Sequence, residues 1–400
     1  MAISISPELG YVLLVFGLFV VPKALQRFRL PSAVSSLALG ASLGLGLGLF
    51  THDAAITQFA TLGIVALFLF AGLEVDFSEL RSELPVLTWH LAIQLGLLGA
   101  VTWGLTMLLP LEARAATLVS LALVTPSTGF ILDSLDRFGL TTRERFWVKS
   151  KAISTELVAL AVLFVVLQSD DAQRLATSFL TLGGLIVVVP VAFHVFARGI
   201  LPFAPKSEFA FLVIVALTCA FVTRKLGVYY LVGAFLVGVA AQRFRRELPA
   251  LASDKMLHAV EVFASFFVPF YFFQAGLHIQ RQDLAWSSVA TGIALLCAAV
   301  PLRILTVAIL RRTALRENWR EALRVSTPLL PTFVFTLVIT DILRERFAPP
   351  SWILGGLVFY TVLNTVIPGF LLHSPPTEPD LLTLADATTE HHAGRPDAAP

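Results

Sequence analysis

A glutamate lies near the middle of a long apolar stretch, where a carboxylate is costly unless it has a use. The stretch runs from Arg143 to Gln168, and mostly uncharged residues follow Glu156. If the stretch crosses a bilayer, a central acid costs about 2.5–3.5 kcal/mol, so such a residue is by default a functional candidate that faces protein or a water-filled cavity. The carboxylate binds either a proton or a small cation, and Thr155 adds a neutral oxygen. We therefore expect an exchangeable proton and cation site at Glu156.

The composition predicts a membrane setting for this acid. Of 400 residues, 56% are hydrophobic and 14% are charged, and the mean hydropathy is +0.81. A soluble domain has about 25% charged residues, so we expect an all-α polytopic membrane protein. The net charge of +2 gives no indication of nucleic-acid binding. Cys219 and Cys297 have no metal-ligand or CxxC spacing, so neither a disulfide nor a bound metal is expected. The first 30 residues contain no evident cleaved signal peptide.

Apolar runs of about 20 residues, separated by charged or proline-rich breaks, predict thirteen membrane-spanning helices. The expected spans are 8–25, 31–50, 55–73, 84–109, 112–135, 143–168, 173–201, 207–224, 227–243, 258–279, 284–310, 317–343 and 350–373. In the second span Gly40, Gly44 and Gly48 form a stripe that we expect to serve close helix packing.

The distribution of basic residues sets the expected orientation. With the N-terminus outside, nineteen lysines and arginines fall on the cytoplasmic side and seven in outer loops. Because cytoplasmic loops carry the excess of positive charge, this predicts a cell (inner) membrane protein with its N-terminus outside and its C-terminus in the cytoplasm. Residues 374–400 are rich in Pro, Ala, Thr and acid, which predicts a disordered cytoplasmic tail after a transmembrane domain of residues 1–373.

Two internal echoes predict a duplicated unit. The motif Ala-Gly-Leu at residues 71–73 returns at residues 275–277, 204 positions later, and the Thr-Pro pair at 125–126 returns at 327–328, 202 positions later. Each echo is displaced by seven predicted helices, so the two copies run in opposite directions through the membrane. This is the inverted-repeat plan of secondary transporters.

Prolines in the middle of the fifth and twelfth spans predict broken helices. Pro126, Pro328 and Pro331 each lack the amide that a helix needs, so helix breaks are expected near them. Broken backbone at membrane depth is tolerated only inside protein or beside a water-filled cavity. Helix ends that meet there offer partial charges and carbonyl groups to an ion.

Several of these stretches resemble those of one family, the monovalent cation:proton antiporter-2 branch of the sodium/proton exchanger superfamily. The resemblance covers nearly the whole chain to about residue 370. LFLFAGLEVDFSEL at the end of the third span is similar to a family signature, and residues 121–139 resemble the broken helix of the family. Residues 154–163 resemble its aspartate helix, and YYLVGAFLVGVAAQ and FFVPFYFFQAGLHI resemble two further helices.

The resemblance implies a fold and a set of site residues. It implies inverted repeats, two crossed broken helices, a homodimer, and elevator-like motion between a core domain and a scaffold. The core is expected mainly at 55–168 and 258–343, and the dimerisation or scaffold helices mainly at 8–50, 207–243 and 350–373. Glu156 matches the family's essential aspartate, Thr155 the residue before it, and Arg303 a membrane-embedded cation. The resemblance implies that Thr125 and Ser127 supply oxygen ligands at the first crossover, and it places Thr327 and Thr332 at the second broken helix.

These features predict an antiporter that exchanges sodium or potassium for protons. Thr155-Glu156 replaces the usual pair that contains an aspartate, so a single carrier carboxylate implies one proton per cation and electroneutral exchange. We expect Arg303 to hold the empty acid. The alternatives are a sodium-coupled organic anion transporter of similar fold and a transport-inactive membrane sensor or scaffold. No nucleotide loop, nucleophile constellation or cofactor motif is evident, so neither an enzyme nor a cofactor is expected.

Other polar residues have more ordinary expected roles. Glu74 and Asp76 are expected to stabilise the fold or a gate, and Asp133 to cap the inner half of the fifth span. Lys149 and Lys151 are expected to reach the cytoplasmic interface, and the alternative for Lys151 is a salt bridge at an inner gate. Glu261 is the best rival acid but lies near a helix end, and the single histidines His90, His194 and His278 are expected to be packed or interfacial residues.

Overall fold

The structure is a computed structural model that describes residues 7–75, 81, 84–227, 230–244 and 253–372, and its regular elements there are helices. The first half contains α1 (Pro7–Gln26), α2 (Ser32–Ser42) with η1 (Leu43–Leu47), α3 (Ala54–Leu73), α5 (Leu84–Leu108), α6 (Ala113–Val124), α7 (Thr128–Ser134) with η2 (Leu135–Phe138), α8 (Thr142–Gln168) and α9 (Ala172–Val195) with η3 (Phe196–Ile200). The second half contains α10 (Glu208–Lys225), α11 (Tyr230–Arg243), α12 (Asp254–Leu277), η6 (Arg281–Leu284), α13 (Trp286–Ala314), α14 (Trp319–Ser326) with η7 (Thr327–Leu329), α15 (Phe333–Arg346) and α16 (Ser351–Leu371).

Each of the thirteen predicted spans contains one helix or an interrupted pair of helices. In the described part of the chain, nine helices are long and apolar enough to cross a membrane, and α14 with α15 forms a tenth candidate that bends by 42°. The helices α2 with η1 and α11 are apolar but shorter. The chain is therefore an all-helical, multi-pass membrane protein.

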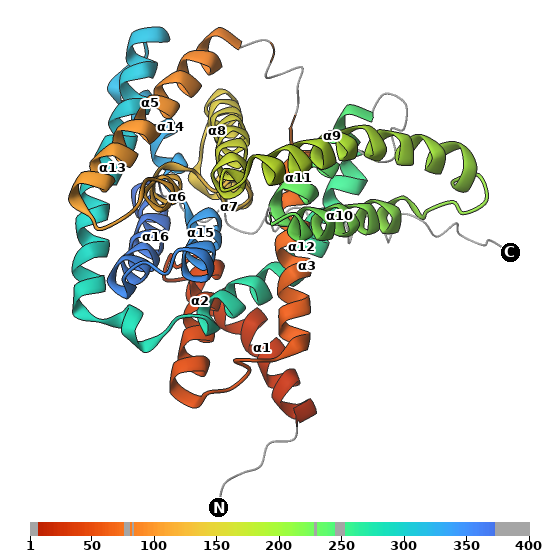
Figure 1. The fold of residues 1–400 in the computed structure, drawn as a ribbon, viewed down its shortest axis with the longest axis horizontal. Coiled ribbons are helices and arrows are strands. Elements are labelled where there is room, and N and C mark those ends of the chain that lie inside the picture. The colour runs from red at the N-terminus through yellow and green to blue at the C-terminus, as the bar shows by residue number, and fades with distance from the viewer. Residues whose placement is uncertain (1–6, 76–80, 82–83, 228–229, 245–252, 373–400) are drawn as a thin grey trace, which may run out of the picture.

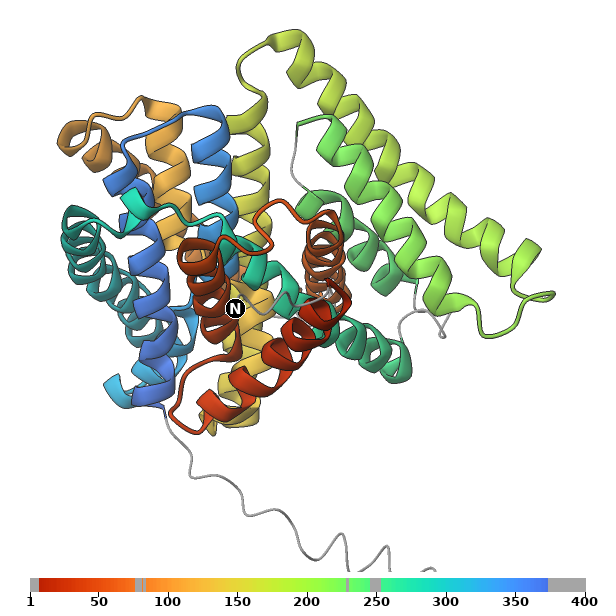
Figure 2. The ribbon, with the colours of Figure 1, turned by 90° about the horizontal axis from the view of Figure 1, so that it is seen from below.

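The helices pack in two groups (Figures 1 and 2). One group contains α5, α6, α8, α13, α14, α15 and α16, in which α16 packs along α13 and against α15, and α6 packs against α5 and α15. In the other group α3 packs against α11 and α12, α2 against α12, and α10 against α11. The short helix α7 contacts both α8 and α3, so it lies where the two groups meet.

Glycines allow close contacts in the second group. A Cβ atom on Gly40 would meet the backbone of Phe273, and one on Gly44 would meet Leu277, as expected for a packing stripe. Gly48 does not belong to this stripe: it has open space around it and ends η1 with a φ of +64°. The echoed glycines make matching contacts, because Gly72 lies against Gly238 of α11 and Gly276 against Gly40 of α2.

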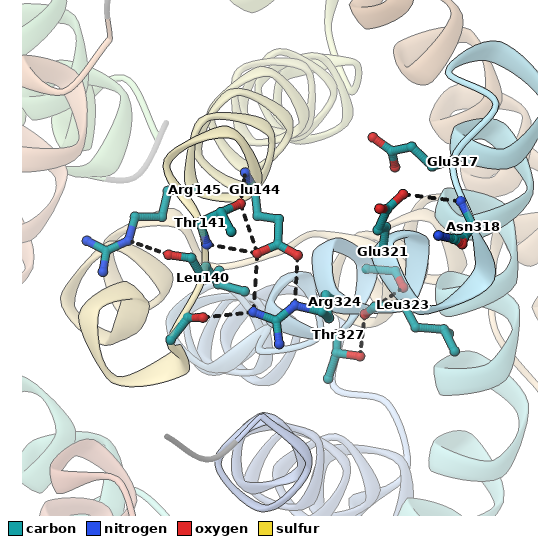
Figure 3. A network of polar contacts seen from close by, with 12 residues as sticks. Leu140, Thr141, Glu144, Arg145, Glu317, Asn318, Glu321, Leu323, Arg324 and Thr327 are labelled. Carbon is teal, nitrogen blue, oxygen red and sulfur yellow. Dashed lines mark hydrogen bonds and ion pairs between the residues drawn. The ribbon is translucent and has the colours of Figure 1, made fainter. Parts of the chain in front are cut away.

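A polar network joins the start of α8 to α14 (Figure 3). Thr141 caps α8, since Glu144 N donates to its side chain and Glu144 Oε2 accepts from Thr141 N at 2.8 Å. The Arg324 guanidinium donates to Glu144 Oε1 at 2.7 Å and to the Gly139 carbonyl at 2.7 Å. This bidentate pattern fixes the helix that carries Glu156 to the first half of the second broken helix.

Candidate functional site

The first break separates α6 from α7 at Thr125–Ser127 and leaves three carbonyl groups without their helical donors. Pro126 has no amide for the Ala122 carbonyl, which instead accepts from Thr336 Oγ1 at 2.7 Å. The Leu123 carbonyl accepts from the Tyr360 hydroxyl at 2.6 Å, and the Val124 carbonyl accepts from Gln94 Nε2 at 3.0 Å. Three other helices, α15, α16 and α5, thus replace the missing backbone donors, as burial requires.

The two amides released at this break donate to groups outside their own helix. Ser127 N donates to the Pro331 carbonyl at 2.8 Å, which joins the two broken helices directly. Thr128 N donates to Glu156 Oε2 at 3.2 Å. The Glu156 carboxylate therefore takes the place of the helix carbonyl at the start of α7, at the point where the broken helices meet.

The second break follows η7 and is held by Arg303. Its NH2 group donates to the Leu329 carbonyl at 2.5 Å, and its NH1 group donates to the Leu330 carbonyl at 2.7 Å and to the Tyr360 hydroxyl at 3.2 Å. These carbonyls lack partners because the helix stops before Thr332. No hydrogen bond or ion pair joins Arg303 to Glu156 among the described residues. In this conformation, therefore, Arg303 does not hold the acid as expected but satisfies the ends of a broken helix.

The two threonines expected at the second crossover have different surroundings. Thr332 is fully buried in a polar network, where its Oγ1 lies 3.1 Å from Thr361 Oγ1 and 2.7 Å from Thr336 Oγ1, and accepts from Asn364 Nδ2 at 3.1 Å. The Thr327 hydroxyl donates to the Leu323 carbonyl of its own helical segment. Thr332 thus lies in the crossover, whereas the Thr327 hydroxyl serves its own helix.

Thr155 and Glu156 have different partners although they are neighbours. The Thr155 hydroxyl lies 3.0 Å from His90 Nε2, and both side chains are buried. A cavity of about 20 Å³ is lined by His90, Gln94, Thr155, Arg303 and Ser326 among others, which is enough room for about one water molecule. His90 is therefore part of the polar interior and not an isolated packed residue.

Glu156 is 2% exposed and has no cationic partner within ion-pair distance among the described residues. By contrast, the buried acid Asp283 of η6 pairs with Arg344 at 2.6 Å. The hydroxyls of Thr125 and Ser127 make no hydrogen bond in the described structure, and the buried Thr128 hydroxyl likewise makes none. A carboxylate and three hydroxyls at the first break thus remain available to a ligand.

A cavity of about 270 Å³ reaches the first turn of α7. Gly129 and Phe130 form part of its wall, together with residues of α2, α3, α12 and α15. His258 and Glu261 line it near the start of α12, where the predicted topology places the cytoplasm. Phe130, which lines the cavity, packs against Phe333 with the ring centroids 6.3 Å apart.

The other charged residues considered in the sequence differ in how deeply they are buried. Glu261 has 57% of its side chain exposed and lies 3.4 Å from His258, so it does not compete with Glu156 as a buried acid. Lys149 forms an ion pair with Glu74, which ties α8 to the end of α3. The expectation that Lys151 reaches the interface is wrong: it is fully buried, and its Nζ has no hydrogen-bond partner in the described chain. Asp76 and the side chain of Asp133 lie outside the described residues.

Sequence reasoning missed the residues that complete the two breaks. Gln94, Thr336, Tyr360 and Asn364 supply hydrogen bonds from neighbouring helices. Their only signal is that each is a polar residue inside a predicted span, and many such residues simply bond to their own helix.

The sequence and the fold both match known proteins. Residues 12–375 match the family model "Sodium/hydrogen exchanger, transmembrane". The chain is 25% identical to the Na(+)/H(+) antiporter NhaS5 of Synechocystis sp., over 92% of this chain and 53% of that protein. It is 28% identical to the glutathione-regulated potassium-efflux system protein KefC of Cronobacter sakazakii, over 72% of this chain and 45% of that protein. The chain thus spans about half the length of these relatives.

The fold is similar to that of the sodium proton antiporter MjNhaP1 from Methanocaldococcus jannaschii, with a TM-score of 0.65 and 14% identity over 91% of this chain and 95% of that chain. At this identity the likeness concerns the fold alone. The family match covers most of the chain and agrees with the resemblance found in its motifs. The chain therefore belongs to the sodium/hydrogen exchanger family.

Proposed function

We propose that this protein is a secondary active antiporter that exchanges sodium or potassium for a proton at Glu156. The observation that carries the proposal is a buried carboxylate where two broken helices meet, bonded to the first amide of α7 and without an ionic partner among the residues that the structure describes. An acid inside a membrane protein that lacks a permanent counter-charge is a candidate for reversible binding of a proton or a cation. The family and the sequence similarity to the Na(+)/H(+) antiporter NhaS5 support the same function.

The chemistry is competition for one carboxylate. Sodium and potassium ions prefer oxygen ligands, and the Glu156 carboxylate with the Thr125, Ser127 and Thr128 hydroxyls supplies them from adjoining positions. Thr155 contributes only if its hydroxyl leaves His90. A proton on Glu156 removes the charge that attracts the cation, so each ion displaces the other. With one such acid we propose one proton per cation and therefore electroneutral exchange.

Alternating access is proposed to arise from sliding between the two helix groups. The predicted core included 55–73 and 258–279, but α3 and α12 pack with each other and with α11 and α2, and α16 packs with α13 and α15. This packing favours a moving unit of α5–α8 and α13–α16 against a scaffold of α1–α3 and α9–α12. Matching glycine contacts at Gly72 and Gly276 support the inverted repeats. Thirteen crossings with the N-terminus outside, the inner membrane and a homodimer remain parts of the proposal.

The organic anion alternative has less support from the site. An anionic substrate needs an available cation at the crossover, but the Arg303 guanidinium there is bonded to two carbonyls and a hydroxyl. The buried Lys151, whose Nζ has no hydrogen-bond partner in the described chain, precedes Glu156 on α8 and is not part of either break. Substrate screening distinguishes the two transport functions, and absence of any transport would favour a sensor or scaffold.

The test is exchange in proteoliposomes that contain an internal pH dye. We expect an outward cation gradient of sodium or potassium to acidify the lumen in the wild type, and Glu156→Gln to abolish this response. Glu261→Gln is the matched control, because its exposed acid lines the cavity but not the crossover. Exchange that survives in Glu156→Gln would place the carrier elsewhere. A response that is insensitive to membrane potential supports the one-to-one stoichiometry.

A further inference from the structure

An apolar slot of about 440 Å³ lies between α8, α9 and α11. In Figure 1, α9 runs alongside α11 and passes the end of α8. The slot wall is almost wholly aliphatic and aromatic, with contributions from Leu157, Ala161, Phe164, Phe179, Ile186 and Leu236. Among the described residues that line it, Arg243 at the end of α11 is the one charged side chain. The slot is thus apolar along its length and cationic at one end.

The α11 wall of the slot is about as long as one leaflet of a bilayer is deep. Its α11 wall runs from Val232 to Arg243, which at 1.5 Å per residue is about 17 Å. Half of the hydrocarbon core of a membrane is about 15 Å. The predicted topology places the Arg243 end at the cytoplasmic surface, where lipid headgroups lie.

The apolar wall of the slot therefore favours an acyl chain, and its cationic end favours an anionic headgroup. Water gains little in an apolar cavity because it finds few hydrogen-bond partners there. An acyl chain makes dispersion contacts with such a wall, although it gains no hydrophobic energy by leaving other lipid tails. The exposed Arg243 guanidinium has no ion pair or hydrogen bond in the described structure, and its planar donors fit a phosphate in a bidentate manner. Selectivity must therefore come from the headgroup.

We propose that the slot binds one anionic phospholipid of the cytoplasmic leaflet, with an acyl chain between α8, α9 and α11 and its phosphate on Arg243. If the proposed function holds, a lipid at this position also affects transport. Leu157 follows Glu156 directly on α8, and α11 belongs to the proposed scaffold, so the lipid lies on the surface along which the two groups slide. An occupied slot is expected to change the rate of exchange.

Binding is tested first without any transport. Delipidated protein is mixed with phosphatidylglycerol or phosphatidylcholine, and bound lipids are counted by native mass spectrometry. We expect one phosphatidylglycerol to bind more tightly than phosphatidylcholine. Loss of a charge-assisted hydrogen bond in Arg243→Gln should weaken this binding tenfold or more, whereas Lys23→Gln, which removes an exposed charge at the same predicted surface, should not.

A second variant fills the slot from α8. Ala161→Trp, with Ala161→Phe as a milder form, should abolish the selective binding while Arg243 is intact, and size-exclusion profiles confirm folding. Equal binding of both lipids by the wild type, or unchanged selectivity in Arg243→Gln or in folded Ala161→Trp, would overturn the proposal and indicate ordinary annular lipid. Selective binding without cation exchange in any liposome would contradict the proposed function but not the lipid site.

Discussion

The amide of Ser127 donates to the carbonyl of Pro331 across 2.8 Å, so the two broken helices are joined through their main chains. Neighbouring groups extend this junction, because Thr336 and Tyr360 donate to the carbonyls of Ala122 and Leu123. Glu156 bonds to the next amide, that of Thr128. The acid is therefore positioned by the same displaced backbone groups that the prolines create.

Shortening the acid tests whether its reach matters. In Glu156→Asp the carboxylate withdraws by one methylene from Thr128 N, which already lies 3.2 Å away. We expect exchange to persist, because a titratable group remains, but with a higher KM for sodium or potassium. The measurement is the cation dependence of dye-monitored exchange in proteoliposomes. An unchanged KM would argue that Glu156 does not contact the cation.

Removing one hydroxyl at the junction should destabilise the protein. Thr336→Val leaves the buried Ala122 carbonyl without a donor, which costs about 1–3 kcal/mol. Thr313→Val is the control, since the exposed Thr313 hydroxyl bonds only within its own helix. We expect a lower Tm in detergent for Thr336→Val alone. Equal Tm values for the two variants would contradict the assigned role.

Replacing Arg303 tests which of two roles it has: stabilising the second broken helix, or acting as the counter-ion of Glu156. A lysine carries one ammonium group and cannot reproduce the guanidinium bonds to both the Leu329 and Leu330 carbonyls. We expect Arg303→Lys to lower the Tm, unlike Arg320→Lys at the exposed start of α14, and to leave the pH midpoint of exchange unchanged. A shifted midpoint would instead indicate that Arg303 pairs with Glu156 during the cycle.

Because α3 and α12 are in close contact, adding one methyl group to α3 at this contact is expected to destabilise the protein. A Cβ atom on Gly63 would meet the backbone of Phe267, whereas one on Gly183 of α9 has open space. Overpacking costs about 1–3 kcal/mol, so Gly63→Ala should reduce the Tm and the yield of folded protein. Gly183→Ala should be neutral or slightly stabilising because alanine favours helix. Similar behaviour of the two variants would contradict the packing.

A histidine at the end of α12 predicts a pH-dependent contribution to stability. The Asp341 carboxylate, 3.7 Å away, raises the pKa of His278 above its usual 6.5. The contribution is therefore fully present below about pH 6.5 and is lost as the pH rises through the raised pKa. The Tm of wild type should exceed that of His278→Gln in acid and converge with it in alkali. His52→Gln, which replaces an exposed histidine, is the control for the substitution itself. A constant difference between wild type and His278→Gln would contradict the prediction.

Much of the architecture could be predicted because its signals are local. Hydropathy located the helices, Pro126 and Pro331 located the breaks, and the burial cost of a charge singled out Glu156. The partners of the released backbone groups could not be predicted, because they come from residues as far away as Tyr360. The same limit explains Arg303, whose burial could be foreseen but not its bonds to the Leu329 and Leu330 carbonyls. Which way a side chain faces across helices depends on tertiary packing.

The three donors at the end of α6 also restrict how the protein can move. Gln94, Thr336 and Tyr360 come from three different helices, and within a membrane a lost bond has no water to replace it. Bending α6 alone would leave its last carbonyls and their three side-chain donors without hydrogen-bond partners. Under the proposed alternating access, we therefore expect the crossover to move as one rigid unit, so that access changes at the surfaces around it.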